Sequence, residues 1–162
     1  MCKKIILDIL AYCVIVIIVN LADQTLDYWI NTMRQIAITA HTGQFRNDKK
    51  TPYITHILGV ADAVEPRLKP IALGHDLLED TKITLDDLKK AGFPKYILDA
   101  IDLLTHRNNE PNITYWKKIL NNPDASTVKV ADIKYNLNDS PSDRQKQKYQ
   151  QALQLFANAG YK

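Results

Sequence analysis

Apolar residues recur along this chain at helical spacing, and turn signals separate the runs. In the segment from residue 94 to residue 105, Ile97, Ile101 and Leu104 lie three or four positions apart behind Pro94, a residue that often opens a helix. No stretch alternates apolar and polar residues over the length of a strand. The pattern therefore predicts an all-α fold with short connections.

Residues that favour helix ends mark the boundaries of these runs. Thr84 is a good N-cap, and Gly92 stands where its helix would end. Ser142 and Gly160 frame the final run in the same way. The predicted helices cover residues 25–41, 57–65, 67–81, 84–91, 94–105, 113–121, 125–138 and 141–159.

The first 24 residues differ in kind from the rest. Lys3 and Lys4 precede an apolar run over residues 5–21, which contains only Asp8 as a charge. Three interpretations stay open: an extra structural helix or a mis-assigned start codon, a membrane anchor, and a cleaved signal peptide. An anchor would bring membrane contact and place the domain outside the cytoplasm. Without an anchor or signal we expect a cytoplasmic protein.

We expect residues 25–162 to form a single domain, and the composition of the whole chain narrows its class. The 162 residues are 46% apolar and 24% charged, as in ordinary soluble domains of about this size. The formal charge of +3 is too small to predict nucleic-acid binding but suits a phosphorylated small molecule. The two cysteines form no CxxC pair, so no zinc site is predicted. The oligomeric state stays open.

The string HDLLEDT at residues 75–81 carries most of the candidate chemistry. If it is helical, His75 and Glu79 project together, and Asp76 and Asp80 form a second pair beside them. An exposed acidic stretch is the alternative interpretation. The apolar residues before and within the string favour partial burial, and clustered buried acids need a positive partner such as a divalent metal.

Two other segments offer further ligands. His56 follows a proline-initiated turn and precedes an apolar run, and Asp132 ends an apolar stripe with Asn136 one helical turn later. Alone, such a histidine would be a core residue and such an aspartate would face solvent. Together with the acidic string they complete a set of nitrogen and oxygen donors that suits a divalent cation.

Four strings in this order resemble those of the HD-domain metal-dependent phosphohydrolases, and more closely those of the RelA/SpoT hydrolase branch. The strings are AHTGQFR (40–46), PYITH (52–56), HDLLEDT (75–81) and ADIKYN (131–136). The resemblance covers about residues 33–138 and implies an HD-domain helical bundle. Because no room is left for a synthetase domain, we expect a small stand-alone hydrolase.

The resemblance also implies roles for individual residues. It implies one bound metal ion, Mn²⁺ in the better-known members, held by His56, His75, Asp76 and Asp132. It implies that Glu79 and Asp80 orient and deprotonate the attacking water, a task for which carboxylates beside a metal are suitable bases. The implied substrate contacts, or residues near them, are Arg46, Lys49, Lys50, Tyr53, Lys134 and Asn136.

The chain departs from the family pattern at three positions. Ile57 replaces the usual proline after the loop histidine, and Lys134 and Tyr135 replace the usual arginine and histidine. Asp132 and Asn136 remain, so these changes bear on nucleotide specificity and leave the metal site intact.

The expected function is a metal-dependent 3′-pyrophosphohydrolase of (p)ppGpp. One alternative is HD-type hydrolysis of another nucleotide, such as the 2′-phosphate of NADPH, a nucleoside monophosphate or an adenine alarmone. The other is a non-catalytic nucleotide sensor. In each case the partner is a small phosphorylated nucleotide.

Several polar residues are not assigned to the site. His41 is expected to lie on the first helix and to pack or hydrogen-bond there, and His106 to lie in a solvated loop, with a place at the rim of the pocket as the alternative. Arg144, Lys146 and Lys148 are expected to form the solvated face of the last helix.

Overall fold

The computed structural model describes residues 25–161. The apolar segment that was interpreted as a helix, an anchor or a signal lies outside these residues. Within the described part, no helix is long and apolar enough to cross a membrane.

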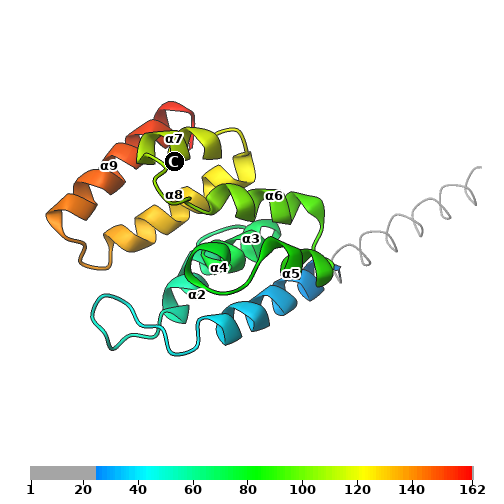
Figure 1. Ribbon diagram of the computed structural model, residues 1–162. Helices are drawn as coiled ribbons and strands as arrows, with labels where there is room; N and C mark the ends of the chain where they lie inside the picture. Colours follow the sequence, from blue (N-terminus) through cyan, green and yellow to red (C-terminus); the bar gives the residue numbers. More distant parts are fainter. Residues whose placement is uncertain (1–24, 162) are drawn as a thin grey trace, which may run out of the picture.

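The described residues fold as helices joined by short connections, which confirms the predicted all-α class (Figure 1). One isolated antiparallel bridge, Phe45–Pro52, closes the loop before the second helix. The helical segments are residues 25–40, α2 (Ile54–Asp62), η1 (Pro66–Leu68), α3 (Lys69–Gly74), α4 (Leu77–Asp80), α5 (Leu85–Lys90), α6 (Lys95–Leu104), α7 (Asn112–Ile119), α8 (Pro123–Leu137) and α9 (Asp143–Asn158).

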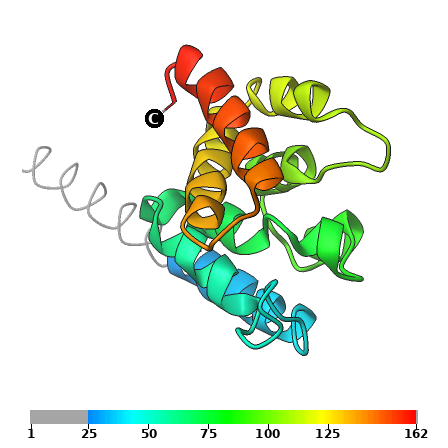
Figure 2. The same ribbon diagram turned by 90° about the vertical axis from the view of Figure 1, so that its left-hand side faces the viewer.

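Helix α8 lies at the centre of the bundle. It packs against α2 and α3 on one side and against α6, α7 and α9 on the others, and Figure 2 shows α9 crossing in front of it. Fully buried Ile71, Ile101 and Val128 come from three of these helices and meet in one hydrophobic core. The centre of α8 is therefore held rigidly, which matters because it carries Asp132.

The predicted helix over residues 67–81 is wrong in one respect, because it is broken at His75 and Asp76. Helix α3 ends at Gly74, and α4 begins only at Leu77. The His75 side chain gives the reason: its Nδ1 donates to the carbonyl oxygen of Ala72 at 2.6 Å. In an unbroken helix that carbonyl would accept from the Asp76 N–H. The break turns His75 inward and leaves the acids of α4 on a separate turn.

The predicted helix ends are confirmed. Thr84 and Ser142 each form a capping box at the start of α5 and α9. Gly92 and Gly160 follow α5 and α9 with φ of 86° and 94°, the left-handed conformation that favours glycine after a helix.

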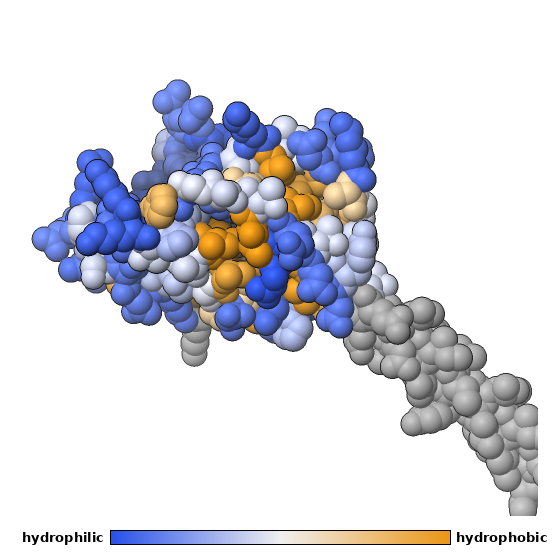
Figure 3. Space-filling view, turned by 90° about the horizontal axis from the view of Figure 1, so that it is seen from below, coloured by the Kyte–Doolittle hydropathy of each residue, from blue (hydrophilic) through white to orange (hydrophobic). Residues whose placement is uncertain are grey.

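The lower side of the bundle, seen in Figure 3, shows apolar side chains between polar ones. Large exposed apolar residues of the described part include Tyr28, Ile38 and Phe45, from the first helix and the loop behind it. Single exposed apolar residues are normal for a folded domain, and Figure 3 also shows apolar side chains gathered near the middle of this face.

Candidate metal centre

Three buried side chains from three parts of the fold meet at the centre of the bundle. The Nε2 atoms of His56 (α2) and His75 (the break after α3) lie 3.2 Å apart. Asp132 Oδ1 (α8) lies 3.2 Å from the first and 3.8 Å from the second. All three donor atoms lie within 4.8 Å of one another, close enough to bind one metal ion.

Asp76 adds a fourth donor atom to this cluster. Its Oδ2 lies 3.1 Å from His75 Nε2 and 3.6 Å from His56 Nε2. The structure thus brings together all four residues predicted as metal ligands. Two imidazoles and two carboxylates form a donor set suited to a divalent first-row cation.

The protonation of His75 fits metal binding. Because Nδ1 donates to Ala72, a neutral His75 ring presents the lone pair of Nε2 to the cluster. Burial alone would lower the pKa of His75, but the carboxylates of Asp76 and Asp132 raise it to about 9 in the metal-free protein. The cluster therefore attracts positive charge, which a proton or a metal ion can supply.

Asp132 is held by two neighbours on α8. Lys129 Nζ lies 2.8 Å from Oδ2, and Asn136 Nδ2 donates to Oδ1 at 2.6 Å. Burial opposes ionisation, but the Lys129 charge and the neighbouring histidines hold the pKa of Asp132 well below its usual range. The carboxylate is thus ionised and fixed in orientation before any metal binds.

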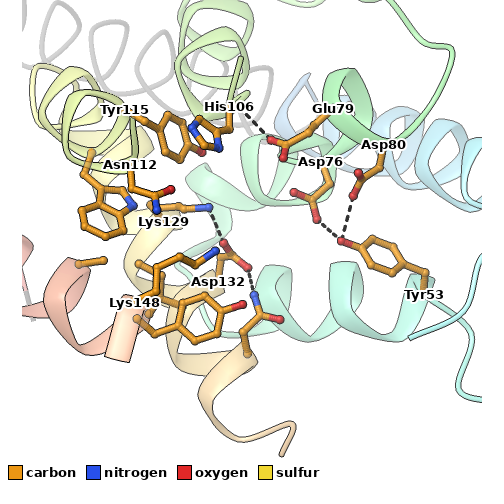
Figure 4. A pocket seen from close by; sticks show the side chains of 15 residues that line it. Tyr53, Asp76, Glu79, Asp80, His106, Asn112, Tyr115, Lys129, Asp132 and Lys148 are labelled. Atoms are coloured by element: carbon orange, nitrogen blue, oxygen red, sulfur yellow. Dashed lines mark hydrogen bonds and ion pairs between the residues drawn. The ribbon is translucent and has the colours of Figure 1, made fainter. Parts of the chain in front are cut away.

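Glu79 and Asp80 lie beside the cluster, but in different surroundings (Figure 4). The Tyr53 hydroxyl lies 2.7 Å from Asp76 Oδ2 and 3.2 Å from Asp80 Oδ2, so it links one metal-ligand candidate to one candidate base. Glu79 Oε2 instead accepts the backbone N–H of His106 at 2.9 Å. Asp76 and Asp80 therefore share a face as predicted, whereas His75 and Glu79 diverge because of the helix break.

The pKa values of both acids are raised. Partial burial is the main cause for Glu79. For Asp80, burial and the negative charge of Asp76 raise the pKa, while the Tyr53 hydrogen bond lowers it. A carboxylate with a raised pKa is a stronger base once ionised, which suits proton abstraction from water.

The loop that precedes α2 is connected to α4 by hydrogen bonds of His41 and Gln44. His41 is buried, and its Nδ1 lies 2.7 Å from Gln44 Oε1. Gln44 Nε2 donates to the carbonyl oxygen of Asp80 at 2.7 Å. His41 therefore contacts the site through Gln44 and through the ring of Tyr53, with ring centroids 5.2 Å apart.

Arg46 reaches the site through Asn136. Its guanidinium lies 2.8 Å from Asn136 Oδ1 and forms an ion pair with Asp139 at 2.6 Å. Asn136 in turn donates to Asp132. Arg46 therefore orients Asn136, and through it the carboxylate of Asp132. A phosphate at Arg46 would compete with Asp139.

The other predicted substrate contacts divide into two groups. Tyr53 and Asn136 line the pocket beside the metal cluster. Lys49 and Lys50 are exposed in the loop and do not line it. Lys134 is exposed on another face of α8, beside a separate hollow.

The pocket has a cavity volume of about 150 Å³, and its second side consists of residues that the sequence analysis did not assign to the site. We call Asp76, Glu79 and Asp80 the acidic wall, and Lys129 and Lys148 the basic wall; Figure 4 shows them on opposite sides of the pocket. Further lining residues are His106, Asn112, Tyr115 and Tyr149.

The structure decides the place of two of these residues, and it corrects the sequence interpretation of Lys148. His106 lies in a loop as expected; it takes the alternative place at the pocket and stacks on Tyr115, with ring centroids 4.4 Å apart. Lys148 lies at the pocket instead of forming part of a purely solvated face. The spacing of Lys129 three residues before Asp132 was a usable signal, because such pairs adjoin on a helix.

Known proteins resemble this chain in sequence and in fold. No family model matches the chain. The chain is 33% identical over 112 residues to a guanosine-3′,5′-bis(diphosphate) 3′-pyrophosphohydrolase, MESH1 of Mus musculus. The match includes 61% of this chain and spans 62% of the length of that relative.

A solved structure shows the same fold. It is that of a metazoan ortholog of SpoT described as hydrolysing ppGpp, with a TM-score of 0.64 and 22% identity, over 81% of this chain and 82% of that one. Fold and site together define an all-helical bundle with a buried cluster of histidines and aspartates at its centre. The expected resemblance to stand-alone ppGpp hydrolases is confirmed in sequence by the mouse relative, and the solved structure shares the fold.

Proposed function

We propose that this protein is a metal-dependent pyrophosphohydrolase that removes pyrophosphate from the 3′ position of (p)ppGpp. The observation that carries the proposal is the Tyr53 hydroxyl, which joins the metal-ligand candidate Asp76 to the candidate base Asp80. A sensor would need a metal cluster but no base attached to it. The 3′-pyrophosphohydrolase activity in the name of the mouse relative supports this choice of reaction.

His56, His75, Asp76 and Asp132 would hold the metal, and we propose Mn²⁺. When bound, a divalent cation there supplies a Lewis acid for a phosphate oxygen and lowers the pKa of water. The cluster is adapted to that charge, because its two carboxylates already draw a proton onto His75 in the metal-free protein.

The remaining chemistry belongs to side chains of the pocket. Asp80, with Glu79 beside it, takes a proton from the water whose oxygen attacks the phosphorus attached to the ribose 3′-oxygen. The bond between that phosphorus and the 3′-oxygen breaks, and the 3′-oxygen takes up a proton. The products are pyrophosphate and the 5′-phosphorylated nucleoside. Lys129 supplies positive charge as the phosphate oxygens become more negative.

The test uses the purified full chain with Mn²⁺ and a panel of ppGpp, pppGpp, NADPH, an adenine alarmone and nucleoside monophosphates. We expect release of pyrophosphate from ppGpp. Turnover of another member alone would assign a different substrate to the same site. Absence of turnover of every member, with Mn²⁺ bound, would overturn the proposal.

The matched variant is Asp80→Asn, which keeps shape but removes the base. We expect about a thousandfold loss of kcat while ppGpp still binds. Tight binding without turnover in the unaltered chain, and no effect of the variant, would indicate a sensor.

A further inference from the structure

Two basic residues of α9 share a face near the metal pocket. Arg144 and Lys148 lie four residues apart, so their side chains project from neighbouring turns on one face. Among the described residues neither forms an ion pair. Lys146, between them in sequence, lies 3.6 Å from Asp143. This face of α9 therefore carries positive charge that no ion pair among the described residues neutralises.

This face adjoins the metal pocket. A second hollow of about 490 Å³ is lined by Asn112, Arg144, Lys148 and three glutamines of α9. Asn112 and Lys148 also line the metal pocket, so the two cavities share one edge. A molecule seated at the metal cluster can thus extend over this edge without crossing the core.

The two cavities differ in charge. Four carboxylates line the metal pocket, whereas the second hollow is lined only by basic and amide side chains. In addition, burial and the charge of Lys129 lower the pKa of Lys148, so an anion placed beside it would relieve a repulsion. Amides and unpaired cations are the donors that phosphate oxygens accept from.

We propose that Arg144 and Lys148, with Asn112 opposite them, form a second phosphate subsite that binds the 5′-phosphoryl groups of the nucleotide. This inference rests on the proposed function, in which the 3′-diphosphate occupies the metal pocket. It assigns substrate selection to α9: a nucleotide phosphorylated at both positions spans both cavities, and one phosphorylated at a single position fills only one.

The test compares kinetics on two substrates: ppGpp and the guanosine 3′-diphosphate that carries a 5′-hydroxyl. In the double variant Arg144→Gln/Lys148→Met we expect KM for ppGpp to rise about tenfold with kcat nearly unchanged. KM for the 5′-hydroxyl compound stays the same. Lys148→Arg keeps the charge and should retain most of the affinity, and Lys146→Met is the control on the same helix.

A second measurement does not depend on turnover. Guanosine 5′-diphosphate has no 3′-phosphate to hydrolyse, and its binding can be followed by calorimetry. We expect the double variant to bind it about tenfold more weakly than the unaltered chain. If binding depends on Arg144 and Lys148 but nothing is hydrolysed, the subsite stands and the proposed function fails. If ppGpp is hydrolysed with unchanged KM and binding in the variant, the subsite fails alone.

Discussion

The acidic and basic walls of the pocket differ in how the chain builds them. The acidic wall comes from one turn of α4 and the residue before it, within five consecutive positions. The basic wall combines Lys129 of α8 with Lys148 of α9, which belong to different helices. The first wall concentrates negative charge where a cation is needed, and the second places positive charge where phosphate oxygens would lie.

The contrast shows why one pocket can accept both a metal ion and a polyphosphate. Asp132 lies between the walls, with one oxygen toward the histidines and the other on Lys129. A single carboxylate therefore couples the two charges. Variants of the acidic wall and of the basic wall should therefore have different effects on metal binding, on stability and on substrate binding.

The largest effect is expected from the acidic side, at the metal cluster. His75→Gln removes an imidazole ligand, and we expect near-complete loss of bound Mn²⁺ and at least about a thousandfold loss of kcat. Metal content by elemental analysis and circular dichroism on the same sample check this. A folded variant that keeps its Mn²⁺ would show that His75 is not a ligand.

The next effect concerns the coupling of the two walls. Lys129→Met leaves the Asp132 oxygen without its buried partner, so the free energy of unfolding of the metal-free protein should fall by about 3 kcal/mol. Urea denaturation at neutral pH measures it. Lys134→Met, at an exposed position of the same helix, is the matched control and should change stability by less than about 0.5 kcal/mol. Equal effects of both would remove the special role of Lys129.

A smaller effect is expected from Tyr53→Phe, which alters the acidic wall without removing a charge. We expect about a tenfold loss of kcat, because Asp80 loses a hydrogen bond that orients it. The base acts when ionised, so activity falls as the pH drops through the pKa of Asp80. Since the Tyr53 hydrogen bond lowers that pKa, the variant should lose activity at a higher pH than the unaltered enzyme.

The pH–rate profile of kcat for both proteins decides this point. An acidic limb that stays in place, or moves to lower pH, would show that Asp80 is not the group that titrates.

The smallest effect is expected far from both walls. Thr84→Ala removes the capping box of α5 and should lower the free energy of unfolding by about 1 kcal/mol, with kcat unchanged. Thermal denaturation and the standard assay check the two parts. A loss of activity would mean that the stability of α5 affects the positions of the pocket residues.

The sequence by itself determined the helical class and the caps of α5 and α9, and its resemblance to the HD-domain hydrolases pointed to the four side chains that the structure brings together. These features are readable because they depend on local patterns: helical periodicity, capping residues, and short strings such as HDLLEDT. Helix positions were also close, although the break at His75 was missed. That break depends on a side-chain bond to Ala72, which competes with the backbone in a way that periodicity does not register.

Only the tertiary structure decided which basic residues face the pocket. Lys49, Lys50 and Lys134 were predicted as contacts and lie elsewhere, whereas Lys129 and Lys148 line the cavity. A lysine is compatible with any partly exposed position of a helix, so its sequence context does not fix the direction it faces. The packing of α7 and α9 against α8 fixes that direction, and with it the charge of the second wall.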